Sequence, residues 1–209
     1  MNVAEALIYE QGFAATSIDA VIQKAGVTKG AFFHHFKSKA ALGLALVERF
    51  AERDEKILER FLSRVEKLSR DPVQQVMLFA ALIEEELGKL GGPHPGCMFA
   101  TFCFEAGLFD ESTRKVIAEG FLKWRDRLQE KFEAAMAVRT PALPVNAREL
   151  ADMVTTIFEG GLVLSKGLDD PAVHVEQMRQ YRNYIELLFT TPAAAAKAAS
   201  TSRPKVRAI

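Results

Sequence analysis

The fold of the N-terminal part of this chain is decided by residues 16–42, which read TSIDAVIQKAGVTKGAFFHHFKSKAAL. Thr16 and Asp19 form the pattern Thr-x-x-Asp, in which a hydroxyl and a carboxylate satisfy the free amides of a helical first turn. We therefore expect Thr16 to cap a short helix. Apolar residues recur with helical spacing at positions 18, 21, 22 and 25, and Gly26 then ends the helix, as glycine commonly does.

A second short helix is predicted directly after this one. Thr28 can cap it, and residues 29–35, with the sequence KGAFFHH, continue it. Val27 lies between the glycine and the cap, and we expect it to fold back on the core. Two short helices joined by a turn that contains glycine are typical of a helix-turn-helix.

The charges of this stretch indicate its use. No acidic residue occurs between Asp19 and Glu48, whereas four lysines and two histidines do. Such a surface suits the phosphates of DNA. Gly30 and Ala31 keep the front of the second helix low enough to approach base edges, and Ser38 can cap the next helix. The alternative is an ordinary helical hairpin whose basic face is simply solvated.

The segments AGVTKGAFFHHFKSKAAL and GFAATSIDAVIQKAGV together resemble the helix-turn-helix of the TetR family of bacterial transcriptional regulators, and the resemblance covers residues 1–48. It implies that Lys39 holds a DNA phosphate and that the residues facing DNA are Thr28, Lys29, Ala31, Phe33, His34 and His35. To these we add Thr16, Ser17, Gly30 and Lys37 as predicted DNA-binding residues. Phe33 stands where many members have a tyrosine, so one phosphate contact is missing. Fewer residues precede the first helix than is usual in the family.

Composition excludes several other classes of protein. The 27 basic and 27 acidic residues cancel, so only the local basic stretch points to a partner. No apolar run approaches a membrane span, and Glu5 and Glu10 interrupt any signal-peptide pattern, so we expect a cytoplasmic protein. Nucleotide-binding, metalloprotease and hydrolase motifs are absent, and we expect no enzyme activity, no cofactor and no metal. A helical scaffold that does not bind DNA remains an alternative.

The rest of the sequence reads as further helices, without strand signals. A helix of up to about 45 Å is expected from Ser38 to Pro72, long enough to connect two domains. We expect an all-α protein with a DNA-binding domain in residues 1–48 and an effector-binding and dimerisation domain in residues 49–191. Residues 192–209 are low in complexity and predict a disordered tail.

An effector pocket is predicted around residues 97–109, CMFATFCFEAGLF, which are apolar almost all round. Ligand pockets are mostly apolar with a few polar anchors, and Glu105 is the one charge in this segment. The predicted lining residues are Met98, Phe99, Phe102, Glu105, Phe121 and Trp124. The alternative is that these residues simply form core. We expect a small, mostly apolar effector that acts on the DNA-binding domain only through the long helix.

A homodimer is predicted through the last two helices, because they carry more apolar surface than packing on one side requires. The predicted interface residues are Ile157, Gly160, Gly161, Leu164, Met178, Tyr181 and Ile185. A two-fold dimer places two recognition helices about one DNA turn apart and so implies a palindromic operator. The predicted function is a repressor that the effector releases.

The two cysteines, Cys97 and Cys103, leave a second regulatory mechanism open. On one helix their spacing separates them too far for a disulfide. They are then two small buried hydrophobic residues, or Cys97 is the thiol of a regulator that senses oxidants or electrophiles.

Overall fold

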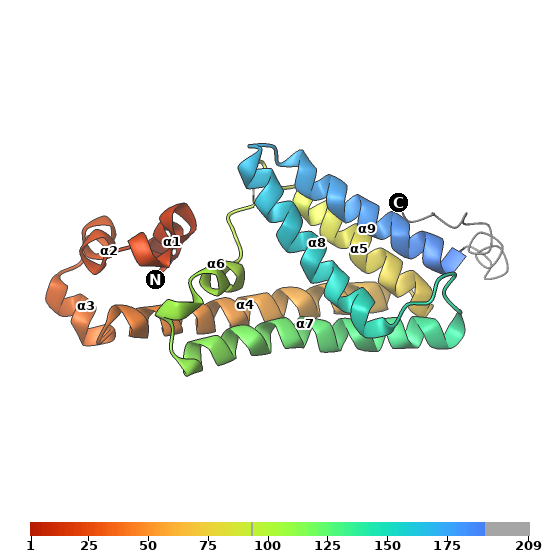
Figure 1. The fold of residues 1–209 in the computed structure, drawn as a ribbon, viewed down its shortest axis with the longest axis horizontal. Coiled ribbons are helices and arrows are strands. Elements are labelled where there is room, and N and C mark those ends of the chain that lie inside the picture. Colours follow the sequence, from red (N-terminus) through yellow and green to blue (C-terminus); the bar gives the residue numbers. More distant parts are fainter. Residues whose placement is uncertain (93, 191–209) are drawn as a thin grey trace, which may run out of the picture. The chain divides into compact units, whose positions relative to one another are not determined.

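The computed structural model describes residues 1–92 and 94–190, and in that part of the chain every regular element is a helix (Figure 1). This confirms the all-α prediction. In chain order the helices are α1 (Asn2–Ala15), α2 (Ile18–Ala25), α3 (Lys29–His35), α4 (Lys39–Leu68), α5 (Pro72–Gly88), α6 (Met98–Phe104), the 3₁₀ helix η1 (Ala106–Leu108), α7 (Glu111–Val138), α8 (Ala147–Gly167) and α9 (Ala172–Thr190). The predicted tail, residues 192–209, lies outside the described residues.

The chain divides into two compact units. Unit 1 contains residues 1–59 and 94–124, and the described part of unit 2 contains residues 60–92 and 125–190. The long helices α4 and α7 each begin in unit 1 and end in unit 2. Residues 94–124 therefore cluster with the helix-turn-helix, although we expected them in the second domain. The functional domain boundaries given above stay a prediction.

Local capping residues form the helix-turn-helix of unit 1. Ser17, not Thr16, caps α2: its hydroxyl accepts the Ala20 N–H at 3.0 Å. Both residues carry a hydroxyl, so the pattern alone placed the cap one position early. Gly26 adopts the expected left-handed conformation at φ 65°. Val27 does not fold back on the core, because 44% of it stays exposed.

The other predicted caps of this region are present. The Thr28 hydroxyl accepts the Ala31 N–H at 3.1 Å at the start of α3. The Ser38 hydroxyl accepts the Ala41 N–H, also at 3.1 Å, at the start of α4. The helix α4 runs unbroken for 30 residues, which confirms the long helix expected between Ser38 and Pro72.

An aromatic core holds unit 1 together. Phe102 of α6 stacks on Phe109 with ring centroids 4.2 Å apart, and Phe13 of α1 packs against both rings. Phe99 contacts Phe50 of α4 at 4.8 Å and Phe121 of α7 at 5.4 Å. Aromatic pairs at such distances stabilise a core beyond the area they bury. The helix α6 is thereby packed on α1, α4 and α7.

In unit 2, α9 packs against α5 and α8. Met178, Tyr181 and Ile185 of α9 are fully buried, and the Tyr181 hydroxyl donates to the Leu150 carbonyl of α8 at 3.2 Å. A Cβ at Gly161 would lie 2.6 Å from the His174 ring, so this glycine allows α8 and α9 to approach within one subunit.

Four of the predicted interface residues are therefore buried inside the subunit, namely Gly161, Met178, Tyr181 and Ile185. Their assignment to a dimer interface was wrong, because helical spacing identifies an apolar face but not the neighbour that covers it.

Candidate nucleic-acid interface

The predicted recognition residues lie on the outside of α3 and in the turns on either side of it. The exposed ones are Thr28, Lys29, Gly30, Ala31, Phe33, His34, His35 and Lys37. Phe32 points the other way and is buried, and its ring meets Phe36 at 5.6 Å. One buried ring thus fixes the helix while its small and basic residues face outward. This arrangement suits a helix that enters the major groove.

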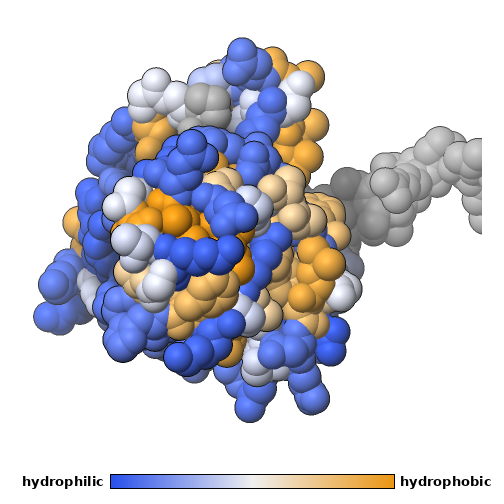
Figure 2. All heavy atoms as spheres, turned by 90° about the vertical axis from the view of Figure 1, so that its left-hand side faces the viewer, coloured by the Kyte–Doolittle hydropathy of each residue, from blue (hydrophilic) through white to orange (hydrophobic). Residues whose placement is uncertain are grey.

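The charges on this face are not held in strong ion pairs. Lys29 lies 3.8 Å from Asp19 and Lys24 lies 3.3 Å from Glu10, and all four side chains are about half exposed or more. Exposed ion pairs contribute little free energy, so a phosphate can replace either carboxylate. Figure 2 shows the face of the molecule that includes α2 and α3 as mostly hydrophilic, with hydrophobic residues gathered in between.

Thr16 does not belong to this exposed face. Its side chain is buried, and its hydroxyl donates to the Gly12 carbonyl at 2.7 Å. Gly12 interrupts α1, and the Thr16 hydroxyl is bound to the carbonyl at that interruption, so it is not available to DNA. Thr16 is therefore not one of the DNA-facing residues. Ser17 is exposed, but its hydroxyl already caps α2.

Lys39 lies in the first turn of α4, as expected, and its side chain has partners within unit 1. Its ammonium donates to the Ala14 carbonyl at 2.9 Å and lies 4.6 Å from the centre of the Phe13 ring. Partial burial lowers the pKa of Lys39, and the Glu105 carboxylate acts in the opposite direction. The side chain is thus held in place before any phosphate arrives.

Glu105 has a different position from the predicted pocket anchor. Its Oε2 accepts the Ala14 N–H at 2.8 Å, so the carboxylate contacts the end of α1. It thereby caps residues 13–15, which form the end of α1 after the interruption at Gly12. Sequence reasoning could not find this contact, because the two residues are 91 positions apart.

The other predicted effector residues occupy separate parts of the unit 1 core. Met98, Phe99 and Phe102 are at most 2% exposed. The Phe99 ring lies against α7 so closely that a Cβ at Gly120 would be 2.3 Å from it. Phe121 and Trp124 are half-buried. The structure thus brings Phe99 and Phe121 together, whereas Phe102 packs elsewhere, against Phe13 and Phe109.

Trp124 has a polar partner that the sequence did not reveal. Its indole N–H donates to the Asp54 carboxylate of α4 at 2.5 Å. Burial raises the pKa of Asp54 to about 6, although the hydrogen bond from Trp124 works against that rise. Asp54 lies among the charged residues from Glu48 to Arg60, where the sequence alone indicates a solvated side of the helix. A charged residue gives no sequence signal of burial.

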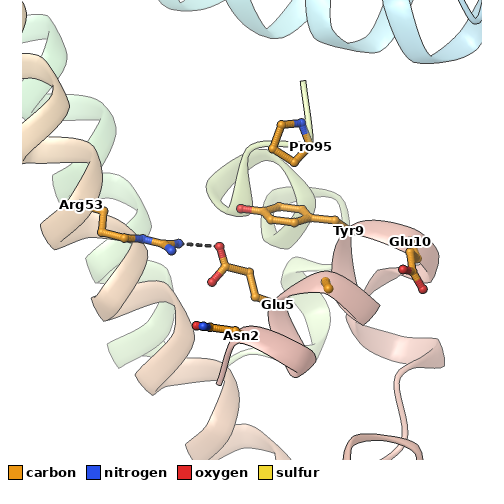
Figure 3. Close-up of a pocket in the computed structure, with 7 residues that line it drawn as sticks. Asn2, Glu5, Tyr9, Glu10, Arg53 and Pro95 are labelled. Atoms are coloured by element: carbon orange, nitrogen blue, oxygen red, sulfur yellow. Dashed lines mark hydrogen bonds and ion pairs between the residues drawn. The ribbon is translucent and has the colours of Figure 1, made fainter. Parts of the chain in front are cut away.

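An open groove of about 550 Å³ lies between α1, α4 and the segment before α6 (Figure 3). It is lined by Asn2, Glu5, Ala6, Tyr9, Glu10, Arg53 and Pro95. Glu5 bridges Arg49 and Arg53, and Figure 3 shows the Tyr9 ring between Pro95 and this ion pair. Burial raises the pKa of Tyr9. None of these residues was predicted as part of a site.

The two cysteines have different environments. Cys97 precedes α6 and is buried, whereas Cys103 is exposed, so the expectation of two buried cysteines is met only at Cys97. Within the described residues, no cluster of three or more His, Cys, Asp or Glu side chains could hold a metal ion. In the same part of the chain no helix is long and apolar enough to cross a membrane.

Comparison with known proteins supports the helix-turn-helix and extends the likeness to most of the chain. Residues 1–46 match the family of bacterial regulatory proteins called the tetR family, and residues 72–173 match the C-terminal domain of LmrA/YxaF-like transcriptional regulators. These are families of regulators rather than of enzymes.

Individual relatives agree with these matches. The transcriptional regulator AcuR of Cereibacter sphaeroides is 27% identical over 75% of this chain and 70% of its own length. The transcriptional repressor DhaR of a Mycobacterium species is 24% identical over 75% of each chain. The fold is similar to that of a TetR-family regulator from Agrobacterium tumefaciens, with a TM-score of 0.73, 23% identity and coverage of 90% of this chain and 95% of that one. This chain therefore belongs to the TetR family of bacterial transcriptional regulators.

Proposed function

We propose that this regulator is a repressor that binds a palindromic operator as a homodimer and leaves it when a small, mostly apolar effector binds. The observation that carries the proposal is the exposed face of α3, where Thr28, Lys29, His34 and His35 surround the low surface of Gly30 and Ala31. The related protein DhaR is named a repressor, which supports repression rather than activation for this protein. Such a protein would act in the cytoplasm, where the operator lies.

Two kinds of DNA contact are expected from this face. Lys37, Lys39 and the imidazoles would meet phosphates and set affinity, whereas Thr28, Lys29 and Ala31 would meet base edges and set sequence choice. Phosphate contacts release counterions, so they should make binding strongly dependent on salt.

The dimer interface that we propose is the outer face of α8 and α9 in unit 2. Val163 and Leu164 of α8 and its C-cap residue Leu168 are each about half exposed or more, and Leu187 of α9 is 62% exposed. Nothing lies within 4 Å of a Cβ built at Gly160, so a second helix can approach closely there. Ile157 and Gly160 stay in the proposed interface with Leu164. A second copy of the same face would cover this apolar surface.

The effector site that we propose lies beside Phe99, Phe121 and Trp124 in unit 1. Phe121 and Trp124 are half-buried, and so give a ligand an apolar surface that it can reach. Asp54 replaces Glu105 as the polar group of this site, because it already holds the Trp124 indole. Binding would displace ring contacts of Phe99 and so act directly on α6.

The test begins with selection of DNA from random fragments, followed by footprinting of the selected site. A palindrome protected over two half-sites about one DNA turn apart is expected, and the absence of any sequence preference would refute the proposal.

Compounds are then screened for release of this DNA. Trp124 is the single tryptophan, so its fluorescence reports binding at the proposed site directly. An effector that releases DNA without changing this fluorescence would refute the site.

A further inference from the structure

The backbone of Ala14 connects three elements of unit 1 through its two polar groups. Its N–H donates to Glu105 at the end of α6 at 2.8 Å. Its carbonyl accepts from the Lys39 ammonium at the start of α4 at 2.9 Å. Ala14 itself is at the end of α1, three residues before the Ser17 cap of the helix-turn-helix. A single residue thus joins α6, α4 and the entry to α2.

A break in α1 makes this connection possible. Gly12 has φ 83° and ψ 165°, which interrupts the helix and frees the Ala14 N–H from its usual helical acceptor. A Cβ at Gly12 would lie 2.5 Å from the Glu105 Oε1, so the glycine also makes room for the carboxylate. The Thr16 hydroxyl takes the freed Gly12 carbonyl at 2.7 Å. The Ala14 N–H and the Gly12 carbonyl, which the break leaves without their usual helical partners, are thus both bound by side chains.

Apolar contacts hold the same three elements in register. The Phe13 ring, next to Ala14, packs 4.7 Å from Phe109 and 5.3 Å from Phe102. The Lys39 ammonium lies over the same ring, 4.6 Å from its centre, and a Cβ at Gly43 of α4 would be 3.0 Å from the ring. A shift of α6 would therefore change the packing of Phe13 and the hydrogen bond of Ala14.

We propose that Glu105 is a positioning residue for operator binding, which fixes the Ala14 peptide and through it the Lys39 ammonium. An ammonium has three donors, and with one on the Ala14 carbonyl two remain for a phosphate. Glu105 and the Ala14 carbonyl hold this long side chain in one place, so that less freedom is lost when it meets DNA. The inference rests on the proposed function, because operator affinity is one of its two measurements.

The same contact gives the effector a second route to the DNA-binding helices. We expected α4 to be the only connection between the effector region and the helix-turn-helix. The Glu105 contact instead connects α6 directly to the end of α1. An effector that moves α6 withdraws the carboxylate, and leaves the Ala14 N–H unpaired and Lys39 less well placed.

The first test needs no DNA and compares the amide exchange rate of Ala14 in the full-length protein, in Glu105→Ala and in Glu105→Gln. Glutamine keeps an oxygen that can accept the N–H, whereas alanine does not. Glu105→Ala should accelerate exchange of Ala14 by about fivefold, because a charge-assisted hydrogen bond is lost. Glu105→Gln should remain closer to wild type. Glu111→Ala, an exposed acidic residue of α7, is the control and should leave the rate unchanged. An equal rate in Glu105→Ala and wild type would overturn the inference.

The second test measures affinity for the selected operator. Both Glu105 variants lose one negative charge, so a purely electrostatic role would tighten DNA binding equally in both. A positioning role predicts that Glu105→Ala binds about fivefold more weakly than Glu105→Gln, a difference of the size expected for one neutral hydrogen bond. In a Lys39→Ala background the two variants should differ by less than about twofold, because the group being positioned is gone.

Equal affinities of the two Glu105 variants when Lys39 is present, or an undiminished difference between them in the Lys39→Ala background, would overturn the positioning role. If no operator is found, the proposed function fails, while the exchange of Ala14 still decides whether the contact exists. The two failures are therefore distinguishable.

Discussion

Replacing Asp54 by asparagine should stabilise the protein at neutral pH and remove one source of its pH dependence. Burial raises the pKa of Asp54 from 3.8 to about 6, a rise of about 2 units. At 1.36 kcal/mol per unit this corresponds to about 3 kcal/mol, as an upper figure, for keeping the carboxylate ionised at pH 7. Asparagine has nearly the same shape and keeps an oxygen that can accept the Trp124 N–H, without the charge.

The sign follows from proton binding. Between about pH 4 and pH 6 the folded protein holds a proton on Asp54 that the unfolded chain has already lost, so the free energy of unfolding falls as pH rises through this window. Above about pH 6 both states are ionised and the contribution of Asp54 is constant. Asp54→Asn should therefore exceed wild type in stability by up to about 3 kcal/mol at pH 7, and by close to nothing at pH 4.

The assay is urea unfolding followed by the fluorescence of Trp124, the single tryptophan, at equal protein concentrations from pH 4 to pH 8. Glu52→Gln removes a charge from an exposed position of the same helix and is the matched control. A constant difference in the free energy of unfolding between Asp54→Asn and wild type across this pH range would refute the reasoning.

Three further predictions concern the DNA face and unit 2. Lys37→Ala should weaken operator binding and reduce the slope of log affinity against log salt by about 1, and an unchanged slope would exclude a phosphate contact. Leu164→Glu should yield monomers in analytical ultracentrifugation, whereas Leu68→Glu, at a similarly exposed leucine, should not; monomeric wild type at micromolar concentration contradicts the proposed interface. Gly161→Leu should lower the free energy of unfolding by roughly 3 kcal/mol, since the His174 ring must move, and normal stability would show that α8 and α9 separate easily.

Much of the helix-turn-helix could be predicted because its signals are local. Gly26, Thr28 and Ser38 each act on backbone groups within four or five positions, and the structure has all three in their expected roles. The lack of acidic residues across α3 is likewise a property of neighbours in sequence. One error of this kind, Thr16 in place of Ser17, arose because two adjacent hydroxyl residues satisfy almost the same pattern.

The candidate effector and dimer residues show what such signals cannot decide. Helical spacing correctly marked Met178, Tyr181 and Ile185 as one apolar face, but α5 and α8 of the same subunit cover it. Leu164 has the same kind of spacing and remains exposed. Apolar periodicity indicates that one face of a helix must be covered. Which element covers that face is decided only by how the whole chain packs.

The sequence by itself determined the all-α class, the end of α2 at Gly26, the caps of α3 and α4, and the basic recognition helix, since each depends on interactions between residues close in the chain. The tertiary structure alone decided that Glu105 meets Ala14, that Asp54 is half-buried and bound to Trp124, and that Gly12 interrupts α1 beneath a carboxylate. These contacts join residues 70 to 93 positions apart. Their formation depends on how whole helices pack, and packing depends on the shape of every side chain between them rather than on any local pattern.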